Sequence, residues 1–189
     1  MSGRWKILVV LAAALFLVAC GGTSQDEFEA EIQSRGGGLG GDLALEAIAA
    51  LEDELGEDLA LRSLTMSVGQ VGMQVRVPGT DDQLDNYQYG SSGLYGSGGL
   101  SEPNPVTGVG SAGELRRSLF RPERIAFDEL DQMVDEAIAT ADLEGGYAQS
   151  VRVDRSGERA VITVGVTSDR ESAEVQFRAD GTPIGSGDG

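Results

Sequence analysis

Several chemically useful side chains are missing or scarce in this chain of 189 residues. It contains no histidine and one cysteine, Cys20, and its single lysine and single tryptophan both precede that cysteine. Nucleophilic catalysis by serine, threonine or cysteine needs a neighbouring base, and tetrahedral zinc and copper sites need histidine or cysteine ligands. Beyond Cys20 the sequence therefore excludes Ser-His-Asp triads, Ser-Lys dyads and these metal sites. It also offers no internal disulfide, so the fold must be stabilised by packing.

Basic residues are fewer than acidic ones: the chain has 14 Lys and Arg and 31 Asp and Glu, which gives a formal charge of −17. Arg4 and Lys6 lie before Cys20 and no acidic residue does, so the chain from Cys20 onward has 12 basic and 31 acidic residues, or −19. Phosphate backbones and anionic lipid headgroups repel such a chain. We therefore expect no nucleic-acid partner.

Aromatic residues make up 5% of the chain, which leaves few platforms for stacking sugars or bases. Glycoside hydrolysis needs only two carboxylic acids at a set separation, and an acidic chain can always supply two. The abundance of carboxylates therefore does not point to a particular catalytic pair, and a carboxylate-dependent hydrolase stays the alternative. We expect no catalytic residue, no metal and no cofactor.

The N-terminus has the features of an export signal. Arg4 and Lys6 are followed by an uncharged, largely apolar run from Ile7 to Ala19. These thirteen residues are fewer than the ~20 that a membrane-spanning helix needs, so the run predicts a cleaved signal peptide.

The end of this run, Leu17-Val18-Ala19-Cys20, resembles the lipobox of bacterial lipoproteins. The resemblance implies cleavage between Ala19 and Cys20 and attachment of lipid, including palmitate, to Cys20. It further implies an anchor on the extracytoplasmic face of the cell membrane, with the covalent lipid making the membrane contact.

After the signal, residues 20–41 are rich in glycine and predict a lipidated, flexible tether. From Asp42 onward apolar residues recur at helical spacing, with Asp42 as the expected cap and Gly56 as the expected end. A second helix is predicted from Phe127 to Ala141. Alternating apolar residues predict strands at 64–68, 71–77, 84–89, 149–154, 160–166 and 173–178.

Each half is thus predicted to contain one helix followed by three strands. This order predicts a degenerate tandem repeat and an α+β fold. Each of the two αβββ units is expected to pack one helix on a three-stranded antiparallel sheet, either separately or with the sheets joined into one. The predicted parts are a signal peptide at 1–19, the tether at 20–41, a first unit at 42–94, a linker or loop at 95–113 and a second unit at 114–189.

This architecture resembles the PepSY-type modules of bacterial envelope proteins and the tandem units of secreted β-lactamase-inhibitor proteins. The resemblance covers residues 42–94 and 123–184. It implies binding or inhibition of another envelope protein and no chemistry, and it transfers no site residues.

The segment from Gly90 to Gly113 holds eight glycines, five serines and two prolines in 24 residues. It predicts either a spacer or a binding loop, and long irregular loops are often binding elements. Tyr95 is its one aromatic residue and therefore its candidate partner contact.

Two charged clusters are candidate sites. Arg116, Arg117, Arg121 and Arg124 lie within nine positions and could contact an anion or an acidic partner. Guanidinium groups also pair readily with carboxylates, so we weigh against this a purely structural pairing with Asp128, Glu129 or Asp131.

The second cluster, Asp81, Asp82, Asp85 and Asn86, holds ligand types that suit calcium. It lacks the glycine and glutamate positions of an EF-hand loop, so we predict a solvated turn between strands.

These observations favour a lipid-anchored extracytoplasmic binding module, attached to the membrane through covalent lipid and facing an envelope protein as partner. The alternatives are a carboxylate-dependent envelope hydrolase and an inert envelope spacer.

Replacement of Cys20 by alanine should abolish lipid attachment, because its thiol is the only one in the chain that can carry a thioether-linked lipid. Metabolic labelling with a radioactive fatty acid measures this directly. Continued incorporation of label into the Cys20→Ala protein would contradict the anchor assignment.

Overall fold

The computed structural model describes residues 39–90 and 98–185, which fall within a compact unit spanning Ile32–Gly189. Residues 1–38, 91–97 and 186–189 lie outside the described residues, and they include Ala19, Cys20, Tyr95 and most of the predicted tether. The signal peptide, its cleavage site and lipid attachment therefore stay predictions.

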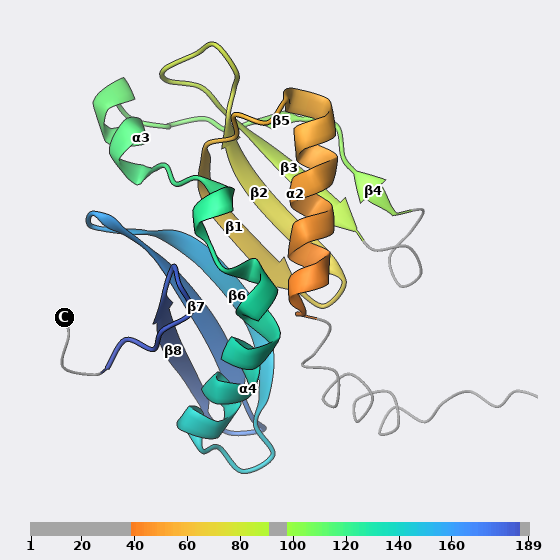
Figure 1. The fold of residues 1–189 in the computed structure, drawn as a ribbon, viewed down its shortest axis with the longest axis vertical. Coiled ribbons are helices and arrows are strands. Elements are labelled where there is room, and N and C mark those ends of the chain that lie inside the picture. The colour runs from red at the N-terminus through yellow and green to blue at the C-terminus, as the bar shows by residue number, and fades with distance from the viewer. Residues whose placement is uncertain (1–38, 91–97, 186–189) are drawn as a thin grey trace, which may run out of the picture. The chain divides into compact units, whose positions relative to one another are not determined.

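The described residues form an eight-stranded antiparallel sheet with helices, which confirms the predicted α+β class. The order of the strands is β4-β3-β2-β1-β6-β7-β8, with β5 also paired to β3 (Figure 1). The six longer strands are β1 (Leu61–Ser67), β2 (Gln70–Arg76), β3 (Leu84–Gly90), β6 (Tyr147–Ser156), β7 (Arg159–Thr167) and β8 (Ser172–Arg178). These six match the six strands that the sequence predicts, with ends that differ by a few residues.

The pairing of β1 with β6 joins the two halves into one sheet. Leu64 lies opposite Val153, and Met66 lies opposite Val151. Outward from this pair, the order β1-β2-β3 on one side mirrors β6-β7-β8 on the other. The arrangement is compatible with two αβββ units, and their origin as a tandem repeat stays a prediction.

The helices α2 (Gly41–Leu55) and α4 (Leu130–Ala141) lie on the same face of the sheet (Figure 1). Their apolar sides join the inward side chains of both halves in one large cluster of buried residues. Alternate residues of the strands, such as Val71, Met73 and Val75, supply the sheet's share of this core. Burial of this continuous apolar surface is the main stabilising term that a chain without disulfides can use.

The start of α2 differs from the prediction. Gly40 is the N-cap and Asp42 lies in the first turn, so Asp42 is not the cap. The backbone N–H of Gly41 instead donates to Asp131 Oδ1 at 3.2 Å. A Cβ at Gly41 would lie 2.1 Å from the carbonyl oxygen of Phe127, so close approach to the segment before α4 requires glycine here. Gly56, with φ of 92°, ends the helix as predicted.

The predicted second helix consists of two parts. A 3-10 turn, η3 (Phe127–Glu129), leads into α4, which ends at Asp142 in the left-handed conformation with φ of 49°. A further 3-10 turn, η2 (Pro122–Arg124), precedes them.

Residues 98–113 pack along β3. They contain the short strands β4 (Gly99–Leu100) and β5 (Asn104–Pro105), and the N–H of Val106 donates to the Leu84 carbonyl at 2.9 Å. Val106 and Val109 also pack against a second, smaller apolar cluster. The described part of the Gly90–Gly113 segment is therefore integrated in the fold.

Helix α3 (Ala112–Ser118) begins in the last two residues of this segment and is not among the predicted helices. Ser111 caps it: its hydroxyl accepts from the N–H of Glu114, and its own N–H donates to the Glu114 carboxylate. The Ser111 backbone donation lowers the pKa of the Glu114 carboxyl. Leu115 on the inner side of α3 completes the second cluster with Leu84 and Leu119.

Replacement of Val134 by aspartate should reduce the free energy of unfolding by several kcal/mol, because the side chain is 2% exposed and the carboxylate would have no partner in the core. Urea denaturation measures the loss. The matched control is Gln132→Asp, which adds the same carboxylate to an exposed position in the first turn of α4. Equal unfolding midpoints for the two variants would show that the buried face of α4 is assigned incorrectly.

Candidate functional site: an arginine-lined pocket

The sheet forks where β1 and β6 separate (Figure 1). The last residue pair between these strands is Ser63 with Asp154. Two residues earlier in β1, Leu61 exchanges both backbone hydrogen bonds with Phe120 instead, at 2.9 and 2.8 Å. The segment between α3 and η2 thus occupies the place beside β1 that β6 leaves.

A pocket of about 630 Å³ opens at this fork. Five segments of the chain line it: the start of β1, the end of β2, residues 116–125, the β6–β7 hairpin and the end of β8. Its lining residues are Ala60, Arg76, Arg116, Leu119, Phe120, Arg121, Arg124, Ile125, Arg155, Glu158, Arg159, Ala160, Arg178, Ala179 and Asp180.

The charge of this lining opposes the charge of the chain. It contains seven of the 13 arginines but only two carboxylates, Glu158 and Asp180, in a chain with a formal charge of −17. Hydrogen bonds from Thr182 lower the pKa of the Asp180 carboxyl, and the nearby Arg178 lowers it further. Asp180 is therefore ionised at neutral pH, and arginine still dominates the lining.

Two of the arginines pair with carboxylates just outside the lining. Arg121 lies 2.6 Å from Asp58 and 3.6 Å from Glu123, and its hydrogen bond with Asp58 raises the pKa of the guanidinium. Arg116 lies 3.8 Å from Asp81.

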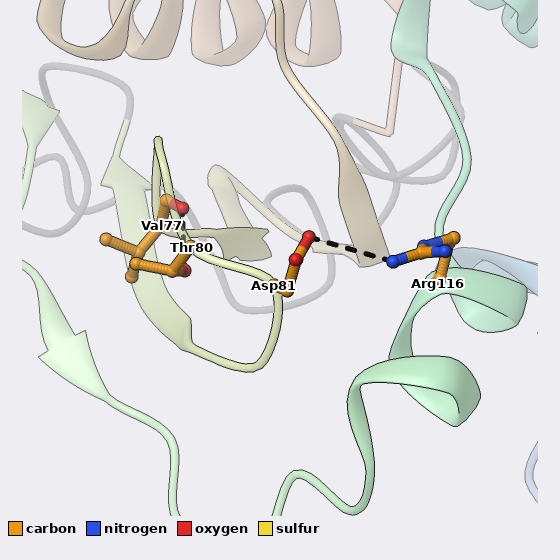
Figure 2. Close-up of polar contacts among 4 residues, drawn as sticks. All are labelled: Val77, Thr80, Asp81 and Arg116. Carbon is orange, nitrogen blue, oxygen red and sulfur yellow. Dashed lines mark hydrogen bonds and ion pairs between the residues drawn. The ribbon is translucent and has the colours of Figure 1, made fainter.

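Figure 2 shows Asp81 pointing from the β2–β3 connection toward Arg116 of α3. Thr80, beside Asp81, donates its hydroxyl hydrogen to the Val77 carbonyl at 2.8 Å and closes the turn. The Asp81 side chain is 73% exposed, and exposed ion pairs contribute about 0–1 kcal/mol to stability.

The sequence correctly predicts that some of these arginines pair with the chain's own carboxylates, but the proposed partners are wrong. Within residues 39–90 and 98–185, no ion pair joins the cluster to Asp128, Glu129 or Asp131. Asp131 instead accepts a hydrogen bond from the start of α2. The observed partners are Asp58 and Asp81, which are far from the arginines in sequence, and Glu123, which lies between Arg121 and Arg124.

Arg155 has a structural role in the pocket. Its Nη1 donates to the Leu119 carbonyl at 3.1 Å and its Nη2 donates to the Glu158 carbonyl. These contacts fasten the β6–β7 hairpin to the segment that enters the fork. Its Nε is buried and has no hydrogen-bond partner among the described residues.

Three pocket arginines are left without an ion pair in the described part of the chain: Arg76, Arg124 and Arg159. A guanidinium presents a planar fork of N–H donors that matches the two oxygens of a carboxylate or phosphate. Buried side chains of Leu119, Phe120 and Ile125 supply an apolar part of the wall, next to which such contacts are stronger than in bulk water. The arrangement can bind an anion.

Of the four arginines that the sequence singles out, Arg116, Arg121 and Arg124 line the pocket and Arg117 does not. The candidate contact Tyr95 lies outside the described residues. Sequence reasoning missed Arg76, Arg155, Arg159 and Arg178, each at or next to the end of a strand.

The predicted turn at residues 81–86 is only partly a turn, because Asp85 and Asn86 lie in β3. Across the described ranges, no group of three or more acidic, cysteine or histidine side chains is placed to hold a metal ion. Nor is any helix in these ranges long and apolar enough to cross a membrane.

No protein-family model matches the sequence, and no curated protein matches it. Among solved structures, the chain is similar to a protein described as a putative lipoprotein from Clostridium difficile 630, with a TM-score of 0.49 and 12% sequence identity. The match covers 75% of this chain and 90% of that one.

Replacement of Arg155 by glutamine should lower the free energy of unfolding by about 1–3 kcal/mol, because two carbonyl groups lose a charged donor. Arg159→Gln in the same hairpin removes an exposed side chain and should change it by less than about 0.5 kcal/mol. Urea denaturation with an unchanged m-value gives both numbers. An equal effect of the two substitutions would contradict the structural role of Arg155.

Proposed function

We propose that this chain is a lipid-anchored module on the extracytoplasmic face of the cell membrane, and that it binds an anionic ligand in the arginine-lined pocket without catalysing a reaction. The observation that carries the proposal is the convergence of seven arginines from separate segments on one pocket. The anchor rests on the sequence Leu17-Val18-Ala19-Cys20 and its resemblance to a lipobox.

A pocket of this composition is poorly explained by stability. Like charges gathered in a small volume repel each other, and the chain has ample carboxylates to neutralise every arginine. Nevertheless Arg76, Arg124 and Arg159 have no ion pair within the described residues. An anionic ligand accounts for this excess of positive charge.

The composition of the lining also favours binding over catalysis. Its side chains include no hydroxyl, thiol, imidazole or amine group. The rival hydrolase would use two carboxylic acids facing one cleft, at least one of them with a raised pKa. Among the residues described, the one buried polar side chain is Thr163 and no carboxylate is buried. An inert spacer, the other alternative, would not need a pocket lined by arginines.

Isothermal titration calorimetry tests the proposal with the full-length, lipid-carrying protein in non-ionic detergent. The probes are inorganic phosphate, succinate and long-chain polyphosphate. At least one should bind, and Arg124→Gln combined with Arg159→Gln should raise its Kd roughly tenfold or more, equivalent to about 1.4 kcal/mol.

Arg117→Gln is the control for loss of a guanidinium outside the pocket, because Arg117 is next to Arg116 and does not line the pocket, and each pocket substitution is also measured singly so that the charge change is the same. It should leave the Kd within about twofold. Absence of binding for every probe, or equal effects of the control and the pocket variant, would refute the proposed function.

A further inference from the structure

We infer that the ligand of the pocket is an anion that carries an apolar body, such as an alkyl or aryl carboxylate or phosphate ester, and not a bare inorganic anion. This inference rests on the proposed function and names the class of ligand for the same site. It follows from the apolar residues of the lining, from the hydrogen bonds that engage their backbone groups, and from the volume of the pocket.

Apolar side chains form almost as large a share of the lining as arginines do. Besides seven arginines and two carboxylates, the lining includes six apolar residues: Ala60, Leu119, Phe120, Ile125, Ala160 and Ala179. Leu119, Phe120 and Ile125 are 9%, 6% and 7% exposed, whereas core residues such as Leu64 and Met73 are 0% exposed. The pocket thus presents an apolar wall beside its charged groups.

This apolar wall lies where the two buried clusters adjoin. Leu119 belongs to the second cluster, and the next residue, Phe120, belongs to the main one. Ala160 and Ala179 pack against the main cluster, and Ala60 packs against the second. Because alanine side chains are small, these three positions leave space in the pocket that an apolar group can occupy.

Backbone polar groups of the apolar wall are already engaged within the protein. The carbonyls of Ala60, Leu119 and Ala179 each accept a hydrogen bond from another segment, at 2.9, 3.1 and 2.8 Å. Phe120 uses both its N–H and its carbonyl with Leu61. A buried water molecule needs about two to four polar partners, so water beside this wall is weakly held, and an apolar group that displaces it gains affinity.

Arginines without an ion pair among the described residues stand next to the apolar wall. Arg124 immediately precedes Ile125, and both line the pocket. Arg159 has the same relation to Ala160. A single ligand can therefore place its anionic group on a guanidinium while its apolar body contacts the wall.

The volume of the pocket exceeds what a bare ion needs. At about 630 Å³, it lies within the range of about 300–1,000 Å³ that sites for small organic molecules occupy. An inorganic phosphate ion or an acetate ion fills a small part of this volume and leaves the apolar wall in contact with water. A ligand with an apolar body removes that surface from water, which favours binding.

Two homologous series of probes test the inference by calorimetry on the full-length, lipid-carrying protein in non-ionic detergent. Straight-chain carboxylates from acetate to hexanoate and phosphate monoesters from methyl to hexyl phosphate separate the two anionic groups, and the anionic group is constant within each series. Titration into detergent alone corrects for entry of the probes into micelles. Each buried methylene improves binding by up to about fourfold, so along at least one series the Kd should fall at least about tenfold.

Dihexanoyl phosphatidylglycerol separates the two sources of such an anion. Tighter binding of this lipid than of hexyl phosphate and hexanoate would identify a membrane lipid as the ligand. The opposite order would identify a soluble organic anion, and either order agrees with the inference.

Replacement of Ala160 by leucine tests where the apolar body lies. The added carbons fill part of the pocket, so the improvement along the series should shrink to less than about threefold, while the shortest member keeps its Kd within about threefold. Ala179→Leu is a second variant of the same kind with the same expected result. Ala173→Leu is the matched control, because it makes the same change at a partly buried strand position outside the lining. It should keep the full improvement.

A constant Kd along both series would overturn the inference, as would an improvement that both Ala160→Leu and Ala179→Leu leave unchanged. In those cases binding that depends on Arg124 and Arg159 would still support the proposed function. Loss of that dependence, or no binding by any probe, would instead refute the proposed function itself.

Discussion

The antiparallel pairing of β1 with β6 is the interaction on which both the core and the pocket depend. It makes one sheet from the two halves, so that α2 and α4 share a single core. A larger core buries a greater fraction of the chain's surface than two half-sized ones, which matters in a chain with no internal disulfide. The same pairing ends at Ser63, and the entry of Phe120 beside Leu61 creates the fork.

The charged side chains at the fork differ in what they contribute. The ion pairs of Arg116 and Arg121 involve exposed side chains, and such pairs add little to stability. Arg155 is different, because it is half-buried and donates to two backbone carbonyls. Its bond to the Leu119 carbonyl connects the β6–β7 hairpin to the segment beside β1. One arginine thus holds the pocket together while others present unpaired donors to it. Stability and ligand binding can therefore be separated by substitution.

Regular elements of this fold could be predicted from the sequence because their signals are local. Period-two alternation marks the six long strands, and period-3.6 spacing marks the two long helices. The two-residue strands β4 and β5 have too few residues to show a period. Helix α3 could have been predicted from the capping box of Ser111 and Glu114, although the preceding residues are rich in glycine.

The pocket could be predicted only in part. Arg116, Arg121 and Arg124 attract notice because they are close in sequence, and they are indeed together in space. Arg76 and Arg178 stand 102 positions apart and meet the others only because β1 pairs with β6. The predicted carboxylate partners are wrong for the same reason, because Asp128, Glu129 and Asp131 are close to these arginines in sequence but form no ion pair with them. Pairing between distant strands has no local signal of this kind.

The contrast between an acidic chain and a basic pocket has a consequence for how an anion would be recognised. The overall negative charge repels anions during approach, so it slows encounter and gives no long-range attraction. Attraction acts only within about 10 Å of the guanidinium groups at 0.1 M salt, and at contact it depends on the fit of planar donors to oxygen atoms. Salt screens the distant repulsion more than the contacts inside the pocket. At the proposed site, discrimination among anions would therefore depend mainly on the geometry of the pocket, and the acidic surface would remove the non-specific binding that a basic surface adds.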